Sequence, residues 1–195
     1  TVPSSPLFGK GKRLSKPLLA REIWDLKAMV GIPGTVENAV SMSPDGRLTA
    51  TASSDGTIRL WDCTNGELLQ NFSKPLGLFG VGHRGEATAV VFKADGAALF
   101  SSGEDGQLLR WDLNDSGGHQ RLKIPVWAAT ALLMLPDQML AIGTRDGHIH
   151  LWPLGAKQSA LDLVHHQDRI TGLTLDRAGQ QLISGSDDQT IRVWA

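Results

Sequence analysis

The sequence is poor in several features that would assign it to particular classes of protein. Its 195 residues include a single cysteine, Cys63, so no disulfide can form within the chain, and a reducing, cytoplasmic location is expected. Tyrosine is absent, although there are six tryptophans. The longest apolar run, residues 128–135, is interrupted by Thr130 and is far shorter than the roughly 20 residues that cross a bilayer, so no membrane partner is expected. The first residue is Thr1 and no apolar signal segment follows it, which indicates a processed chain or an excerpt of a longer one.

Charge and short motifs exclude further classes. The 19 Lys and Arg residues nearly balance the 20 Asp and Glu residues, and the net charge of -1 argues against a globally basic nucleic-acid binder and against an acidic disordered chain. The sequence contains neither a phosphate-binding Gly-Lys-Ser/Thr loop nor a dinucleotide fingerprint. His148 and His150 alternate along one expected strand, but no array of Cys or carboxylate residues completes a metal site. We therefore expect neither a cofactor nor a metal ion.

Residues 1–30 form a basic arm that differs from the rest of the chain. They carry six basic and two acidic residues, together with Pro3, Pro6 and Pro17. Basic runs of this kind usually lie in solvent, so we expect a linker or an edge segment. The alternative is an electrostatic handle for an acidic partner, including nucleic acid. Residues 31–195 carry 13 basic and 18 acidic residues, and this acidic excess argues against nucleic acid as the partner.

The remainder of the chain repeats one short template four times, in residues 54–62, 104–112, 145–153 and 187–195. In each copy an Asp precedes a Trp by six residues, and the successive Trp residues are 50, 41 and 42 positions apart. A period near 40 residues indicates an array of supersecondary units. Asp-Gly turns between apolar runs predict four short strands in each of the first three units and three in the last. The expected units are residues 31–73, 74–124, 125–164 and 165–195.

These units resemble the WD-repeat family over about residues 31–195. The resemblance implies an all-β fold, a β-propeller whose blades are four antiparallel strands. Four blades are few for this family, so we expect a partial propeller or an excerpt of a longer one, with self-association or further blades to cover its ends. Residues 17–26 would then form an isolated outer strand, which in this family completes the last blade.

The family's polar tetrad, which consists of a His, a Ser or Thr, the turn Asp and the Trp, connects the strands within a blade. The second unit has His83, Ser101, Asp105 and Trp111, the fourth has His166, Ser184, Asp188 and Trp194, the first keeps Thr51, Asp55 and Trp61, and the third keeps Asp146 and Trp152. Pro33 and Pro125 replace the His of the first and third units, and Ile142 replaces the hydroxyl of the third. We expect these groups to be structural and not catalytic, because they satisfy one another inside each blade.

Members of this family bind partners chiefly on the face that bears the loops entering each first strand and the turns between the second and third strands. The resemblance places there Ser54, Glu86, Thr88, Glu104, Ala128, Thr130, Arg145, Arg169, Thr171 and Asp187. The insertion at residues 74–82 adds Leu78 and Phe79, and Trp127 begins a first strand. The alternatives are that Leu78 and Phe79 fold back onto the blade and that Trp127 packs between blades. The mixed charges favour a partner with some basic character.

The sequence therefore predicts a non-catalytic scaffold that binds a peptide or protein surface on this face, as a regulatory part of a longer chain. Two alternatives remain open. One is a hydrolase-like enzyme that uses the central pocket of the propeller, although the remaining exposed groups include no obvious nucleophile. The other is contact with nucleic acid through the basic arm.

Overall fold

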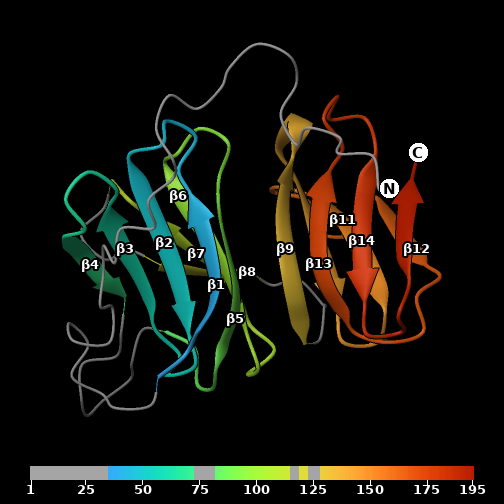
Figure 1. Cartoon of the computed structure of the whole chain (residues 1–195), viewed down its shortest axis with the longest axis horizontal. Helices are drawn as coiled ribbons and strands as arrows, with labels where there is room; N and C mark the ends of the chain where they lie inside the picture. Colours follow the sequence, from blue (N-terminus) through green and yellow to red (C-terminus); the bar gives the residue numbers. More distant parts are fainter. Residues whose placement is uncertain (1–34, 73–81, 115–118, 123–127) are drawn as a thin grey trace, which may run out of the picture. The chain divides into compact units, whose positions relative to one another are not determined.

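The computed structural model describes residues 35–72, 82–114, 119–122 and 128–195, which form four antiparallel sheets (Figure 1). We call these sheets blades 1 to 4 in chain order. Blade 1 contains β1 (Glu37–Met42), β2 (Leu48–Ser53), β3 (Ile58–Asp62) and β4 (Leu68–Phe72). Blade 2 contains β5 (Ala87–Phe92), β6 (Ala98–Gly103), β7 (Leu108–Asp112) and β8 (His119–Leu122).

Blade 3 contains β9 (Ala129–Leu135), β10 (Met139–Thr144), β11 (His148–Pro153) and β12 (Leu161–Val164), with a short 3₁₀ turn, η1 (Pro136–Gln138), between its first two strands. Blade 4 contains β13 (Ile170–Leu175), β14 (Leu182–Ser186) and β15 (Ile191–Trp194). In every blade the spatial order of the strands is their order in the chain. The expected all-β fold, with three four-stranded units followed by a three-stranded one, is confirmed.

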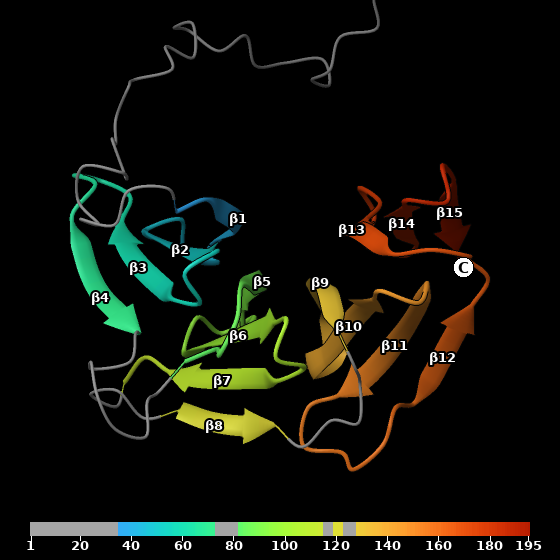
Figure 2. The ribbon, with the colours of Figure 1, turned by 90° about the horizontal axis from the view of Figure 1, so that it is seen from below.

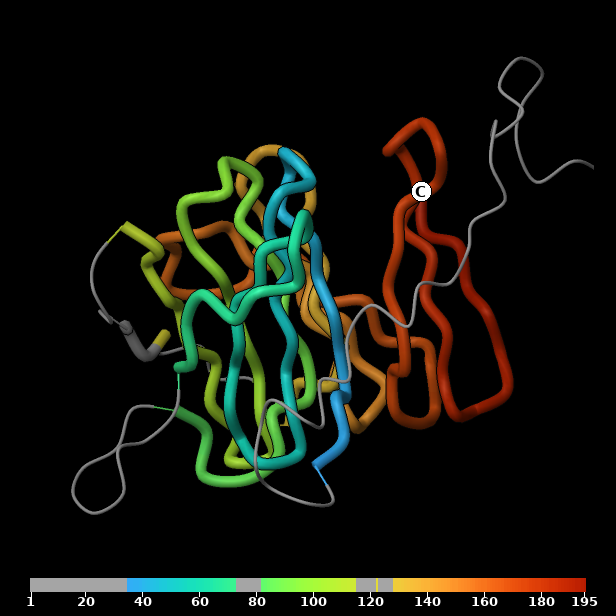
Figure 3. The backbone as a smooth tube through the Cα atoms, turned by 60° about the vertical axis from the view of Figure 1, so that its left-hand side comes forward, coloured from blue at the N-terminus to red at the C-terminus, as the bar shows by residue number. Residues whose placement is uncertain are grey.

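Neighbouring blades meet through their first strands. β5 lies against β1 on one side and β9 on the other, and β9 also lies against β13. Figure 2 shows the first strands on the inner side of the sheets and β4, β8 and β12 on the outer side. Figure 3 follows the chain from one blade into the next. This is the radial arrangement of propeller blades.

Tight turns join the strands, and glycine is required in one of them for two reasons. Gly56, in the turn between β2 and β3, has φ of 81°, which disfavours residues with a side chain. A Cβ atom there would also lie 2.6 Å from the carbonyl oxygen of Gly85 in blade 2. The Asp-Gly turn thus lets blade 1 approach the loop of blade 2 closely.

The apolar core is divided among the blade boundaries. One cluster joins blades 1 and 2 through residues such as Ile58 and Trp111. The next joins blades 2 and 3 through Phe100 and Trp152, and a third joins blades 3 and 4 through Ile149 and Ile170. Each blade therefore buries its apolar faces against its neighbours, as expected for a repeat protein.

The outer face of blade 4 lacks such a neighbour among the described residues. Ile191 lies three residues before the last Trp, at the position that Ile58 and Ile149 occupy in blades 1 and 3. Both of those side chains are 0% exposed, whereas Ile191 is 77% exposed. Val193, two residues further on the same strand, is also exposed. Within the part of the chain that the structure describes, blade 4 is thus one end of the array.

Candidate functional site

The tetrad of blade 2 forms a continuous chain of hydrogen bonds from β7 to the turn before it. Trp111 Nε1 donates to Ser101 Oγ at 2.8 Å, and Ser101 Oγ lies 2.8 Å from His83 Nε2. His83 Nδ1 lies 3.0 Å from Asp105 Oδ1. Asp105 also accepts a bond from the backbone N–H of Arg84 at 2.9 Å. The four tetrad residues of this unit are therefore brought together in one network.

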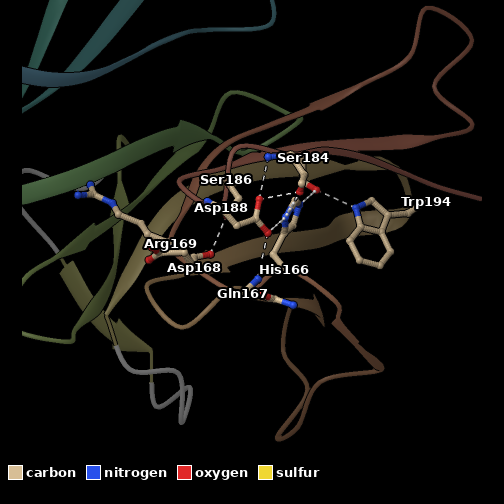
Figure 4. Close-up of polar contacts among 9 residues, drawn as sticks. His166, Gln167, Asp168, Arg169, Ser184, Ser186, Asp188 and Trp194 are labelled. Carbon is tan, nitrogen blue, oxygen red and sulfur yellow. Dashed lines mark hydrogen bonds and ion pairs between the residues drawn. The ribbon is translucent and has the colours of Figure 1, made fainter.

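Blade 4 repeats the same arrangement (Figure 4). Trp194 Nε1 donates to Ser184 Oγ at 2.9 Å, and Ser184 Oγ lies 2.8 Å from His166 Nε2. His166 Nδ1 lies 2.8 Å from Asp188 Oδ2, which also accepts from the backbone N–H of Gln167 at 3.0 Å. Both tetrads tie the loop that enters the first strand to the second and third strands.

Electrostatics assign the proton positions in blade 2. Burial lowers the pKa of His83 below its ordinary value of 6.5, although Asp105 acts in the opposite direction. Burial acts to raise the pKa of Asp105, but hydrogen bonds from the Arg84 N–H and from His83 outweigh it, so that this pKa lies below its ordinary value. A neutral His83 then donates from Nδ1 to an ionised Asp105 and accepts from Ser101 at Nε2.

This arrangement has the residue types of a hydrolytic triad but not its accessibility. Ser101 is fully buried and its oxygen already accepts the bond from Trp111. A nucleophile must reach a substrate, whereas here each group is occupied by another group of the same blade. The geometry supports a structural role for the tetrads.

Blade 1 contains a substitution that the sequence reasoning missed. Pro33, at the expected place of the His, lies outside the described residues, and Arg59 from β3 binds the turn Asp instead. Its guanidinium lies 2.5 Å from Asp55 Oδ2 and 3.1 Å from Glu37 Oε1, and the side chain is buried. The available signal was Arg59 itself, a charged residue four positions after Asp55 and two before Trp61. Trp61 Nε1 still donates to Thr51 Oγ1 at 3.1 Å.

Blade 3 has no such network between its two retained residues. Asp146 accepts a bond from the Thr144 hydroxyl, and its side chain is 69% exposed, against 7% for Asp105. Trp152 Nε1 donates to the carbonyl oxygen of Ala156 at 3.3 Å. Ile142 replaces the Ser and is buried in the apolar cluster. Apolar packing of Ile142 therefore replaces the hydrogen bonds that the Ser makes in blades 2 and 4.

The end of the blades that carries the turns between second and third strands is called the loop face. In every blade the backbone N–H of the residue before the turn Asp donates a hydrogen bond to the backbone carbonyl oxygen of the residue that precedes the first strand. These pairs are Ser54 to Val36 (2.8 Å), Glu104 to Glu86 (2.9 Å), Arg145 to Ala128 (3.1 Å) and Asp187 to Arg169 (2.9 Å). In blades 2, 3 and 4 both members of the pair are predicted loop-face positions, which therefore lie side by side; in blade 1 only Ser54 was predicted.

A pocket of about 140 Å³ lies on the loop face where blades 2, 3 and 4 converge. It is lined by Thr88, Gly103, Glu104, Ala128, Ala129, Thr130, Arg145 and Arg169. The predicted positions Glu86, Thr171 and Asp187 do not line it. Drug-sized ligands fill cavities of about 300–1,000 Å³, so this pocket has room for one side chain of a larger partner.

The two threonines of the pocket are engaged between blades. The Thr88 hydroxyl donates to the Ala129 carbonyl at 2.8 Å, and the Thr130 hydroxyl donates to the Ile170 carbonyl at 2.6 Å. Each threonine lies two residues after the residue that precedes the first strand of its blade. The hydrogen bonds from this position therefore join successive blades. Neither hydroxyl is poised as a nucleophile.

Three other predicted partner-binding residues, Leu78, Phe79 and Trp127, lie outside the described residues, and their roles stay predictions. The same holds for the basic arm and for residues 17–26. Within the described ranges, no three His, Cys, Asp or Glu side chains are grouped so that they could hold a metal ion. No helix of the described chain is long and apolar enough to cross a membrane.

Comparison with a family model gives a direct match. The model described as "WD domain, G-beta repeat" matches residues 30–62, 73–112 and 157–195, which together are more than half of the chain. Most of the third unit falls between these ranges. That unit is the one in which Ile142 stands in place of the tetrad hydroxyl, and it nevertheless folds as a blade.

Several known proteins are similar to this chain. It is 29% identical to WD repeat-containing protein 55 of Danio rerio, over 78% of this chain and 39% of that protein. It is 28% identical to Periodic tryptophan protein 2 of Arabidopsis thaliana, over 80% of this chain and 17% of that protein. It is 29% identical to Target of rapamycin complex subunit wat1 of Schizosaccharomyces pombe, over 80% of this chain and 48% of that protein. The chain thus spans less than half the length of these relatives.

Among solved structures, the crystal structure of the computationally designed Ika4 protein has the same arrangement of sheets. It matches with a TM-score of 0.64 and 27% sequence identity, and the match covers 84% of this chain and 93% of that chain.

Proposed function

The chain belongs to the WD-repeat family, and from that premise we propose that it is a non-catalytic scaffold that binds a peptide or a protein surface on its loop face. The observation that carries this proposal is the pocket at which loop-face residues of three blades converge. Four of the residues that the sequence singled out for binding, Thr88, Glu104, Arg145 and Arg169, line it. Such convergence of predicted positions on one small concave site is typical of a recognition surface.

The other polar clusters of the described residues support this assignment by being occupied. The buried His and Asp side chains of blades 2 and 4 are bonded within their tetrads, and the pocket threonines are bonded to backbone carbonyls. The groups that remain for a partner are the charged side chains Glu104, Arg145 and Arg169. These bind and orient, but none is a nucleophile, so recognition fits the site better than catalysis does.

The name of one relative, Target of rapamycin complex subunit wat1, describes that protein as part of an assembly. This supports a protein partner here, and the regulatory role within a longer chain stays a prediction. The cytoplasmic location inferred from the lone Cys63 and the contribution of the 74–82 insertion stay predictions.

The test is a peptide library displayed on phage and selected against the immobilised chain. Selected peptides are then measured by isothermal titration against Glu104→Arg and, as a matched control on the opposite face, Asp95→Arg. Asp95 is an exposed acid in the turn between β5 and β6. Because Glu104→Arg reverses a charge of the pocket, we expect its affinity to change at least tenfold, about 1.4 kcal/mol, whereas binding to Asp95→Arg should be unchanged. Peptides that lose affinity only with Asp95→Arg would place the site on the other face, and a library without binders would contradict peptide recognition.

A further inference from the structure

Arg169 is the charged group of the loop-face pocket that has no partner. Its side chain extends away from the tetrad of blade 4 (Figure 4) and lines the pocket. Among the described residues, its guanidinium makes no hydrogen bond or ion pair, and its Nε atom is buried without an acceptor. Arginine stays protonated in proteins, so this is a permanent cation with unused donors.

Three other charged side chains of the loop face, Arg145, Glu104 and Glu86, have partners. Arg145 Nη2 lies 3.4 Å from Glu104 Oε1, with both side chains about half exposed or more. Glu86 accepts a bond of 3.4 Å from the Asn38 side chain of blade 1. Ion pairs at this exposure contribute little and rearrange readily. Two of the three acidic residues that favoured a basic partner in the sequence are therefore occupied, and the third, Asp187, does not line the pocket, whereas Arg169 lines it and is free.

We propose that the pocket binds a carboxylate, supplied by an Asp or Glu side chain of the partner, through the guanidinium of Arg169. This inference rests on the proposed function, because it names the group that the loop-face pocket takes. A planar guanidinium binds a carboxylate through two parallel N–H donors, which gives both strength and direction. The pocket volume of about 140 Å³ suits one such side chain. Arg145, on the same pocket wall, is the second cation and exchanges Glu104 for the incoming carboxylate.

A carboxylate fits the pocket better than a phosphate does. A phosphorylated side chain brings a charge of about -1.5 to -2, and it would meet the Glu104 carboxylate that lines the same space. The three charged side chains that line the pocket, Glu104, Arg145 and Arg169, have a net charge of +1, which balances a single negative charge. The inference therefore commits to Asp or Glu in an unmodified peptide.

The test uses NMR titration of the ¹⁵N-labelled chain with three blocked five-residue peptides. The first is acetyl-Gly-Ser-Glu-Ser-Gly-amide, the second has Gln in place of Glu, and the third has phosphoserine there. We expect the Glu peptide to shift the amide signals of Thr130 and Arg169 and to bind at least tenfold more tightly than either of the others. Arg169→Gln should abolish this preference. Arg177→Gln should keep it, because Arg177 is exposed on the turn between β13 and β14, at the opposite end of the same blade.

Each other outcome has a defined meaning. Equal binding of the Glu and Gln peptides, with the same signals shifted, would overturn the carboxylate inference and leave loop-face recognition intact. Tighter binding of the phosphoserine peptide, absence of binding by the Glu peptide, or an unchanged preference in Arg169→Gln would also overturn it. The proposed function fails separately, if the library-selected peptides depend on the opposite face. The amide spectrum of Arg169→Gln shows directly whether that variant is folded.

Discussion

The hydroxyl of Thr130 donates a hydrogen bond of 2.6 Å to the carbonyl oxygen of Ile170, across the boundary between blades 3 and 4. Thr88 makes the same bond from blade 2 to blade 3, and the Asn38 side chain donates to the Ala87 carbonyl at 3.0 Å from blade 1 to blade 2. The three donors occupy one register position near the start of the first strand. Each blade is thus fastened to the next by an equivalent bond beneath the loop face.

This relationship makes a prediction about stability. Thr130→Val removes the buried donor with little change in shape and leaves the Ile170 carbonyl without its partner, so we expect the free energy of unfolding to fall by about 1–3 kcal/mol. Thr171 occupies the same position in blade 4, where it is exposed and makes no hydrogen bond among the described residues. Thr171→Val should therefore change stability by less than about 0.5 kcal/mol. Urea unfolding of both variants decides the matter, and equal effects would show that the inter-blade bond contributes nothing.

A second prediction concerns the turn Asp residues. Asp105→Ala should lower the thermal midpoint by several degrees, because it leaves His83 and the Arg84 N–H without their acceptor at a cost of about 1–3 kcal/mol. Asp146→Ala, at the equivalent but largely exposed position of blade 3, should cost much less. Binding of a selected peptide should survive in folded Asp105→Ala. Loss of binding with an unchanged melting point would contradict the structural assignment of the tetrad.

The tetrad also predicts how stability responds to acid. Burial gives folded His83 a pKa below the 6.5 of the unfolded side chain, so the unfolded chain binds a proton first as the pH falls. The contribution of His83 is therefore complete above about pH 6.5 and decreases as the pH falls through its lowered pKa. Asp105, whose pKa is also lowered, adds a loss only below its ordinary 3.8. Unfolding free energies at about pH 7.5 and about pH 5 should differ less in His83→Gln than in the unaltered chain; an equal difference would assign the acid sensitivity to other groups.

The repeat template was sufficient to predict the blades and their strands. Period, turn residues and the invariant Asp-to-Trp spacing are local properties of the sequence, and the resemblance to the WD-repeat family that they carry implied the two complete tetrads of His83 and His166. The template was not sufficient at Arg59. In blade 1 the guanidinium of Arg59, on β3, binds the turn Asp in place of a His side chain. This contact depends on how β3 lies beside the turn between β2 and β3, which the template does not specify. It also gave no indication that Thr88 and Thr130 face the next blade.

The positions of the candidate site could be predicted from the sequence, but the pairing of its charged side chains could not. The resemblance to the WD-repeat family placed Glu104, Arg145 and Arg169 on one face. Which of them are paired depends on distances between blades, as in the 3.4 Å contact of Arg145 with Glu104. For that reason the sequence led to the expectation of a basic partner, whereas the carboxylate proposal rests on Arg169, which has no partner among the described residues.

Arg59 itself leads to a fourth prediction. Its side chain is 1% exposed and faces the carboxylates of both Asp55 and Glu37. Arg59→Met would leave two poorly hydrated acids without a cation, so we expect a loss of about 3–5 kcal/mol. Arg110→Met is the control, because Arg110 bonds Asp112 on a partly exposed surface, where the loss of such a pair costs about 1 kcal/mol or less. Chemical unfolding of both variants should show this difference, and equal losses would mean that the Arg59 pair is no stronger than a surface one.

The end of the array gives the last prediction, that the chain self-associates as its concentration rises. Ile191 occupies the position that buries Ile58 and Ile149 in blades 1 and 3, and Val193 occupies the position that buries Leu60 in blade 1, yet they are 77% and 57% exposed. Val40 and Met42 of β1 are exposed in the same way, whereas their counterparts Val90 and Phe92 are buried. Adjacent exposed apolar residues of this kind mark association surfaces.

Sedimentation velocity over a range of concentrations should therefore show reversible oligomers. Ile191→Lys combined with Val193→Lys should shift the distribution toward monomer, because charge on this face opposes its burial. Gln180→Lys combined with Gln181→Lys adds the same charge to the exposed turn of blade 4 and should leave association unchanged. A monomer at every concentration, or equal association of the two double variants, would contradict this prediction.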